Sequence, residues 1–223
     1  MGEMKRGTVG IIAGLLLIAA ALFLSGYNVW DGSRAGAETE AVLERLLPKI
    51  DEDPVPAEGR MQYVHAQQSG DGEAQPVRED RPEYPDYVLD PNREMPVITV
   101  DGKEYIGVVS VPALEMELPV FAEWNYQNLK TAPCRYMGSV YLDDMILCAH
   151  NYDQHFGRLK NLKYGDGVLF TDADGNVFHY RVTEIEMLDS TAVEQMPEGE
   201  WDLTLFTCTV GGAKRVTVRC NRE

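Results

Sequence analysis

An uninterrupted apolar segment near the N-terminus constrains this chain more than any other feature. Residues 7–30 contain no charged side chain, and their core, residues 9–24, reads VGIIAGLLLIAAALFL. About 20 apolar residues are enough for a helix to cross a bilayer. Tyr27 and Trp30 lie where aromatic side chains gather at a membrane surface. The segment is therefore predicted to be a transmembrane helix.

The orientation of this helix follows from its flanking charges. Lys5 and Arg6 precede the apolar run, so the positive-inside rule predicts a cytoplasmic N-terminus and an external chain after Asp31. A cleaved signal peptide is the alternative, because Ala35-Gly36-Ala37 resembles a small-residue cleavage site. That site lies well past the apolar run, which favours an uncleaved anchor. We expect a single-pass membrane protein with residues 1–30 as cytoplasmic tip and anchor.

Acidic residues and proline dominate the next region. Residues 31–95 hold 16 Asp and Glu against 7 Lys and Arg, and the whole chain has a net charge of −16. Such a surface argues against nucleic acid as a partner, since phosphates bind basic surfaces. Four apolar residues recur at helical spacing: Leu43, Leu46, Leu47 and Ile50. They predict an amphipathic helix near residues 37–49. The rest of residues 31–83 is interpreted as a spacer that holds the following domain off the membrane and carries no chemistry.

Short β-prone runs fill residues 84–223. A strong hairpin signal joins residues 97–100 and 105–111 through Asp101-Gly102. Further strands are expected at 139–142, 145–149, 168–171, 177–187, 203–208 and 215–220, and short helices at 122–129 and 154–162. About eight short strands in one domain predict an all-β fold, either a closed or nearly closed barrel or a sandwich.

Four cysteines lie in this domain, at positions 134, 148, 208 and 220. Four cysteines in an external protein usually indicate two disulfides. If Cys208 is a free nucleophile, at most one bridge can form among the other three, and the sequence does not select the pair. Four free thiols are the other possibility.

Cys208 has an arginine close to it in the expected sheet. It ends the run 203–208, and Arg215 begins the next run beyond Gly211-Gly212. If the two runs are antiparallel neighbours, Arg215 lies beside Cys208. A guanidinium there can stabilise a thiolate or donate hydrogen bonds to an oxyanion. Arg219 is the rival arginine, but it lies further along the same strand and further from the thiol.

An imidazole completes the parts of a cysteine acyl-transfer site. His150 directly follows the expected strand 145–149. A lone histidine in such a place is more often structural than catalytic, but its combination with Cys208 and Arg215 favours chemistry. The other histidines are weaker candidates, placed in the spacer, before a helix and within a strand: His65, His155 and His179.

These residues together resemble the sortase family, the membrane-anchored cysteine transpeptidases of Gram-positive bacteria. The resemblance covers about residues 104–220. Thr204-Leu205-Phe206-Thr207-Cys208 matches the family signature Thr-Leu-X-Thr-Cys. Four other segments resemble the family's opening strand, its continuation, the histidine segment and the arginine strand: residues 106–114, 118–120, 149–151 and 215–218. The resemblance implies a sortase-type β-barrel as the catalytic domain, residues 84–223.

The resemblance also implies a division of roles. Cys208 attacks a carbonyl within a sorting signal of Leu-Pro-X-Thr-Gly type and forms a thioacyl enzyme. His150 acts as general acid for the leaving amine and as general base for the incoming one. Arg215 orients the peptide backbone and the oxyanion, and Thr207 and Asn151 are expected to contact the substrate. The donors are surface or pilin proteins that carry a sorting signal, and the acceptor is an amine of a peptidoglycan precursor or a pilin. No cofactor or metal is implied, and calcium dependence is left open.

The interval between His150 and Cys208 bears on the sortase subclass, and two alternative functions are left open. His150 and Cys208 are only 58 positions apart, which leaves no room for the long helical insertion of class B sortases. A compact class D-like or class A-like enzyme is expected. One alternative is an extracellular cysteine peptidase that uses the same three residues for hydrolysis. The other is a non-catalytic surface domain in which Cys148, His150 and Cys208 bind a metal ion.

Overall fold

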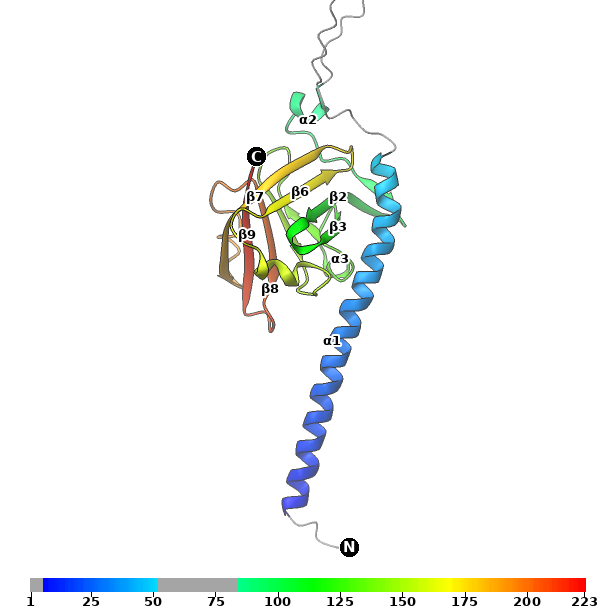
Figure 1. Cartoon of the computed structure of the whole chain (residues 1–223), viewed down its shortest axis with the longest axis vertical. Helices are drawn as coiled ribbons and strands as arrows, with labels where there is room; N and C mark the ends of the chain where they lie inside the picture. Colours follow the sequence, from blue (N-terminus) through cyan, green and yellow to red (C-terminus); the bar gives the residue numbers. More distant parts are fainter. Residues whose placement is uncertain (1–5, 52–83) are drawn as a thin grey trace, which may run out of the picture.

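The computed structural model describes residues 6–51 and 84–223, which form one long helix and a β-barrel (Figure 1). The helices are α1 (Arg6–Asp51), α2 (Asp86–Leu89) and α3 (Tyr126–Leu129), with two 3-10 helices, η1 (Pro112–Leu114) and η2 (Phe156–Asn161). The strands are β1 (Ile98–Val100), β2 (Lys103–Val111), β3 (Met116–Phe121), β4 (Cys134–Met137), β5 (Met145–Ala149), β6 (Gly167–Asp172), β7 (Val177–Asp189), β8 (Leu203–Cys208) and β9 (Lys214–Arg222).

Eight strands close the barrel in the order β2-β3-β4-β5-β8-β9-β7-β6, and β6 pairs back onto β2. The short strand β1 pairs with the beginning of β2. Neighbouring strands are antiparallel except for β3–β4 and β5–β8, which are parallel. Buried apolar side chains from seven of these eight strands form one cluster, to which β4 does not contribute. The predicted all-β fold with a closed barrel of about eight strands is confirmed, and the fold is a barrel rather than a sandwich.

A glycine makes the closure of the barrel possible. At Gly107 the pairing of β2 with β3 shifts, and the φ angle is 145°. A Cβ atom at this position would lie 2.0 Å from the backbone oxygen of Thr171 on β6. Only glycine lets β6 approach β2 this closely and adopts this backbone conformation without strain.

Most expected strands form, and one does not. The hairpin turn has positive φ angles at Asp101 and Gly102, as a tight two-residue turn requires. The strand expected at residues 139–142 is wrong: the amide of Leu142 donates to the carbonyl of Ser139, and the Asp144 carboxylate accepts from the Ser139 amide. These bonds make a turn, a conformation that aspartate side chains favour. The strand in this part of the chain is β4, just before it.

The helix expected at residues 122–129 is shorter than predicted, because α3 spans only Tyr126–Leu129. Asn125 is its N-cap and accepts hydrogen bonds from the amides of residues 127 and 128. Since an N-cap residue starts a helix, the chain before it is not helical. The helix expected at 154–162 is the 3-10 helix η2.

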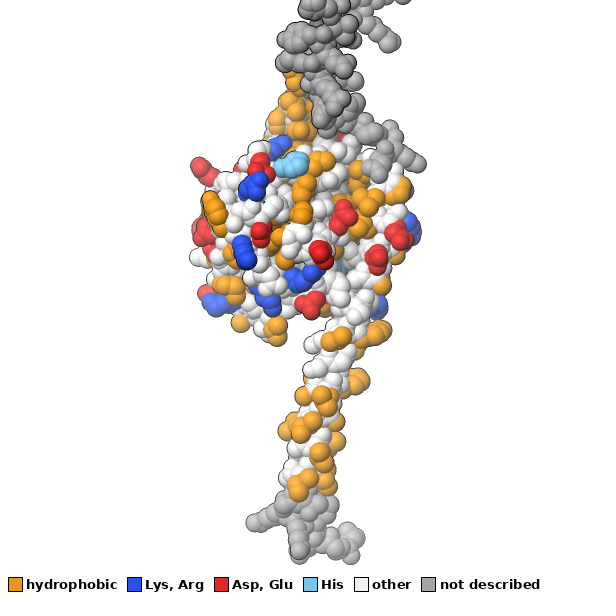
Figure 2. Space-filling view, in the orientation of Figure 1, with side chains coloured by type: hydrophobic (Ala, Val, Ile, Leu, Met, Phe, Trp, Pro, Cys, Tyr) orange, Lys and Arg blue, Asp and Glu red, His pale blue; other side chains and the backbone are white. Residues whose placement is uncertain are grey.

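The anchor and the predicted amphipathic helix are parts of one continuous helix, α1. Among the described residues, α1 is the one helix long and apolar enough to cross a membrane, and its most apolar window has a mean hydropathy of 2.5 with no buried residue. Apolar side chains are distributed along the visible face of the free half of α1 (Figure 2). This half is compatible with a membrane anchor.

The other half of α1 packs against the barrel. Its buried residues follow a helical stripe: Gly32, Ala35, Thr39, Val42, Leu46 and Ile50. Val42, Leu46 and Ile50 join an apolar cluster with barrel residues such as Tyr105 and Phe121. Lys49 donates to the carbonyl of Thr99 on β1, at 2.8 Å. Residues 31–51 therefore lie on the barrel surface, and the remainder of the predicted spacer, with His65, lies outside the described residues.

Candidate active site

Two parallel strands bring His150 and Cys208 to the same end of the barrel. In the pairing of β5 with β8, Ala149 is opposite Thr207. His150 and Cys208 are the next residues on the two chains, and adjacent strands lie about 4.8 Å apart. The Thr207 hydroxyl donates to the carbonyl of Ala149 at 2.8 Å, which ties the two strand ends together. The two residues singled out from the sequence thus lie on adjacent strand ends.

The β8–β9 hairpin brings Arg215 to the thiol. The two strands are antiparallel, as expected, and Cys208 is opposite Arg215. Nη1 of Arg215 donates to Sγ of Cys208 at 2.8 Å. Positive φ angles at Gly211 and Gly212 form the turn between the strands. This contact places a permanent cation directly beside the sulfur.

Burial separates Cys208 from the other three cysteines. All four are free thiols in the described structure, and Cys208 alone among them is partly exposed. Burial raises the pKa of Cys134 and of Cys220 to about 12. Burial also raises the pKa of Cys148. Three thiols are therefore buried and protonated, and Cys208 is the one that can reach a substrate.

His150 is partly buried, and its surroundings favour the neutral imidazole. Burial lowers the pKa of His150, the Asp31 carboxylate on α1 raises it, and Lys130 lowers it. A neutral imidazole can accept a proton from a thiol or an amine. The described alternatives are less suitable, because His179 lies on the outer face of β7 and burial lowers the pKa of His155 to about 4.

Arg219, the rival arginine, is occupied elsewhere. Its side chain is 2% exposed and forms an ion pair with Glu186 at 2.8 Å. Its other nitrogens donate to the carbonyls of Gln195 and Met196 and to the hydroxyl of Thr204. Arg219 therefore fastens the β7–β8 loop to the barrel.

The remaining two predicted residues have different environments. Thr207 is 2% exposed, and its hydroxyl bonds to the protein backbone, so in this structure it positions the strand end. Asn151 is partly exposed and lines a shallow pocket of about 410 Å³, together with Asn28 and Val29 of α1 and Val210 of the β8–β9 turn. Substrate contact by either residue stays a prediction.

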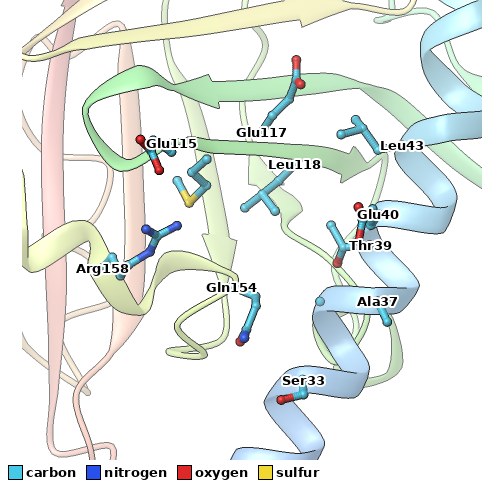
Figure 3. A pocket seen from close by; sticks show the side chains of 12 residues that line it. Ser33, Ala37, Thr39, Glu40, Leu43, Glu115, Glu117, Leu118, Gln154 and Arg158 are labelled. Carbon is cyan, nitrogen blue, oxygen red and sulfur yellow. The ribbon is translucent and has the colours of Figure 1, made fainter.

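A small groove beside Arg215 was not predicted from the sequence. It has a volume of about 70 Å³ and is lined by β4, the end of β7, β8, β9 and the β7–β8 loop: Tyr136, Asp189, Ser190, Ala192, Val193, Met196, Phe206 and Arg215. A larger cleft of about 550 Å³ lies between α1 and β3 (Figure 3), and the residues that line it do not include Cys208, His150 or Arg215. The loop 190–196 carries no motif that marks it, so only the folded structure reveals the groove.

The structure does not assemble the ligands of the metal alternative. Within residues 6–51 and 84–223, no three His, Cys, Asp or Glu side chains are grouped closely enough to hold a metal ion. Cys148, His150 and Cys208 therefore do not form such a group. The cation that contacts sulfur is the Arg215 side chain instead.

Comparison with known proteins identifies the family. The sortase domain family matches residues 109–223, from within β2 through β9. The chain is 27% identical to Sortase A of Bacillus anthracis over an alignment of 116 residues, and the match covers 49% of this chain and 55% of that protein. It thus spans about half the length of this curated relative.

Two solved structures are also similar. Sortase C1 from Streptococcus agalactiae is 25% identical with a TM-score of 0.50, over 60% of this chain and 74% of that chain. Sortase C1 from Streptococcus suis is 27% identical with a TM-score of 0.46, over 53% of this chain and 73% of that chain. The expected class D-like or class A-like subclass stays a prediction. Since the family match covers more than half of the chain, this protein belongs to the sortase family.

Proposed function

We propose that this protein is a cysteine transpeptidase that cleaves a sorting signal of Leu-Pro-X-Thr-Gly type and transfers the attached surface or pilin protein to an amine of the cell wall or of a pilin. Family membership supports transpeptidase chemistry in general. The observation that carries the proposal is the 2.8 Å contact between Arg215 and the partly exposed thiol of Cys208, at the strand end next to His150.

Each of the three side chains has one task in this mechanism. His150 takes the proton of the Cys208 thiol, the sulfur attacks the threonine carbonyl, and the resulting oxyanion accepts a hydrogen bond from Arg215. The carbon–nitrogen bond to glycine then breaks, and His150 gives a proton to the leaving amine. An acceptor amine next attacks the thioester, His150 takes its proton, and Cys208 is released. Thr207 holds the ends of β5 and β8 in register throughout.

The groove beside Arg215 supports a peptide substrate with an apolar residue near the scissile bond. Its lining combines Val193 and Met196 with the aromatic rings of Tyr136 and Phe206. A volume of about 70 Å³ suits one aliphatic side chain rather than a ring system. If the leucine of the sorting signal binds in this groove, the next residues of the signal extend past Arg215 toward Cys208.

The experiment is acyl-enzyme formation by the full chain in lipid nanodiscs. The full chain is needed because α1 covers an apolar cluster on the barrel. A Leu-Pro-X-Thr-Gly peptide should add the mass of its N-terminal fragment to wild type and not to Cys208→Ala. Added glycine peptide should then convert the adduct into a new peptide product. If the adduct were hydrolysed at the same rate with and without glycine peptide, the peptidase alternative would be favoured. An adduct on Cys208→Ala would refute the assignment of the nucleophile.

A further inference from the structure

We propose that Asp31 of α1 is a positioning residue for His150 and acts through Tyr152, so that the anchor helix forms part of the active site. This inference rests on the proposed role of His150. Asp31 is the first charged residue after the apolar segment, and it lies 119 positions before His150 in the sequence.

Direct contacts connect Asp31 to the histidine loop. The Tyr152 hydroxyl donates to Oδ2 of Asp31 at 2.5 Å, in a partly buried position. The ring of Tyr152 lies 5.1 Å from the ring of His150 and 5.5 Å from that of His155. Tyr152 therefore contacts both imidazoles, and Asp31 holds its hydroxyl end in place. A tyrosine fixed at both ends restricts the orientations that His150 can adopt.

Two more turns of α1 hold the same loop. A Cβ atom on Gly36 would lie 2.7 Å from Cγ of Gln154, so glycine is needed for this approach. Gln154 and the α1 residues around this contact border the cleft seen in Figure 3. One turn further on, the Thr39 hydroxyl donates to the carbonyl of Thr131 at 2.6 Å and lies 3.1 Å from Nε2 of His155. Three successive turns of α1 thus hold the loop that contains His150.

The charge of Asp31 has a definite effect on the histidine. The groups around His150 are Asp31 from α1, Lys130 after α3, Tyr152 and His155 in its own loop, and Cys208 with Arg215 across the strand ends. Burial and Lys130 disfavour the imidazolium, and Asp31 opposes them. When His150 carries the proton that it passes to the leaving amine, the Asp31 carboxylate stabilises that charged state.

The test compares Asp31→Asn with Glu44→Gln, in the full chain in nanodiscs. Both variants remove one negative charge from α1, but Glu44 is exposed. The first readout is the pKa of His150, followed by NMR with ¹³C-labelled histidine and assigned with His150→Gln. Asp31→Asn should lower this pKa and Glu44→Gln should leave it unchanged. The second readout is kcat/KM across pH for a sorting peptide, which should fall about 10- to 100-fold in Asp31→Asn, the loss typical of a misplaced catalytic group.

Two further variants separate positioning from folding. Tyr152→Phe keeps the ring but lacks the hydroxyl, and its effect on kcat/KM should not add to that of Asp31→Asn, since both break one link. Asp31→Glu should recover part of the activity. An unchanged pKa of His150 in both Asp31→Asn and Tyr152→Phe, or fully additive effects, would overturn the inference. The NMR titration needs no turnover, so it tests the link to His150 even if the proposed function fails.

Discussion

Replacement of Arg215 by lysine tests which property of the guanidinium matters. In the structure Nη1 of Arg215 contacts the sulfur of Cys208 at 2.8 Å, and the other nitrogens remain able to meet an oxyanion or a peptide carbonyl. Lysine keeps the positive charge but offers a point charge instead of a planar set of donors. Loss of one directed donor to an oxyanion costs about 10²- to 10³-fold in rate, or ~2.7–4 kcal/mol of transition-state stabilisation.

The measurement is kcat/KM for a fluorogenic sorting peptide across pH, on the full chain. We expect Arg215→Lys to lose about 10²-fold or more, and Arg215→Ala to lose at least as much. If Arg215 served only to favour the thiolate, Arg215→Lys would retain most of the activity and Arg215→Ala alone would displace the pH profile. That result would refute the oxyanion role. Arg181→Lys is the matched control, because Arg181 is exposed on β7.

Replacement of Arg219 by lysine is expected to affect stability rather than catalysis. From the sequence, this change is expected to be mild, since Arg219 lies further from the thiol. In the structure the side chain is buried and bonds to Glu186 and to two carbonyls of the β7–β8 loop. Lysine cannot make all of these bonds, so we expect a loss of about 1–3 kcal/mol in stability. Thermal unfolding should detect this loss, and the pH profile of kcat/KM should keep its shape.

Three further predictions concern the thiols, the barrel closure and the helix docking. A maleimide should label Cys208 alone in the native chain and all four cysteines after unfolding, as read by mass spectrometry; native labelling of Cys208→Ala would contradict it. Gly107→Ala should cost at least ~1–3 kcal/mol, because a Cβ would meet the Thr171 carbonyl; an unchanged Tm would show that β6 can move away. Leu46→Ala, at a fully buried position, should cost about 2–5 kcal/mol, and an unchanged Tm would mean that α1 does not stay on the barrel.

Local patterns were enough to predict the parts of the fold that neighbouring segments determine. Asp101-Gly102 between two β-prone runs predicts the β1–β2 hairpin, and Gly211-Gly212 predicts the turn that pairs β8 with β9. The Cys208–Arg215 contact follows from that turn, since antiparallel pairing places the end of one strand beside the start of the next. Strand β4 could not be predicted in this way, because it has four residues and pairs with β3 through a single position.

The environment of Thr207 could have been inferred from strand periodicity. Alternate residues of a strand face opposite sides, so Thr207 faces away from Cys208. In the structure Phe206 and Cys208 are partly exposed, whereas Thr207 is buried. The sequence motif identifies Thr207, and the alternation of residues along the strand predicts that its side chain points away from that of Cys208.

The docked half of α1 was only partly predictable. The apolar residues near its C-terminal end predict an amphipathic helix, but the helix approaches the histidine loop through Gly32, Gly36 and Thr39. Small and polar residues do not register in a hydrophobic pattern, although they permit the closest contacts. The bond between Tyr152 and Asp31 joins residues 121 positions apart, and no local pattern reports such a pair.

If residues 9–30 span the bilayer, as the sequence predicts, the continuity of α1 determines where the end of the barrel with Cys208 lies. These 22 residues rise about 33 Å, close to the thickness of a hydrocarbon core. The next residue, Asp31, already contacts the loop of His150. Residues 28 and 29 line the same pocket as Val210, which is 93% exposed at the tip of the β8–β9 turn. In that case the end of the barrel that carries Cys208 would lie at the membrane surface, rather than at the distance that a flexible spacer would allow. A donor protein whose scissile bond is held near the membrane would then meet the thiol in the same layer, and α1 would both anchor the barrel and orient this end.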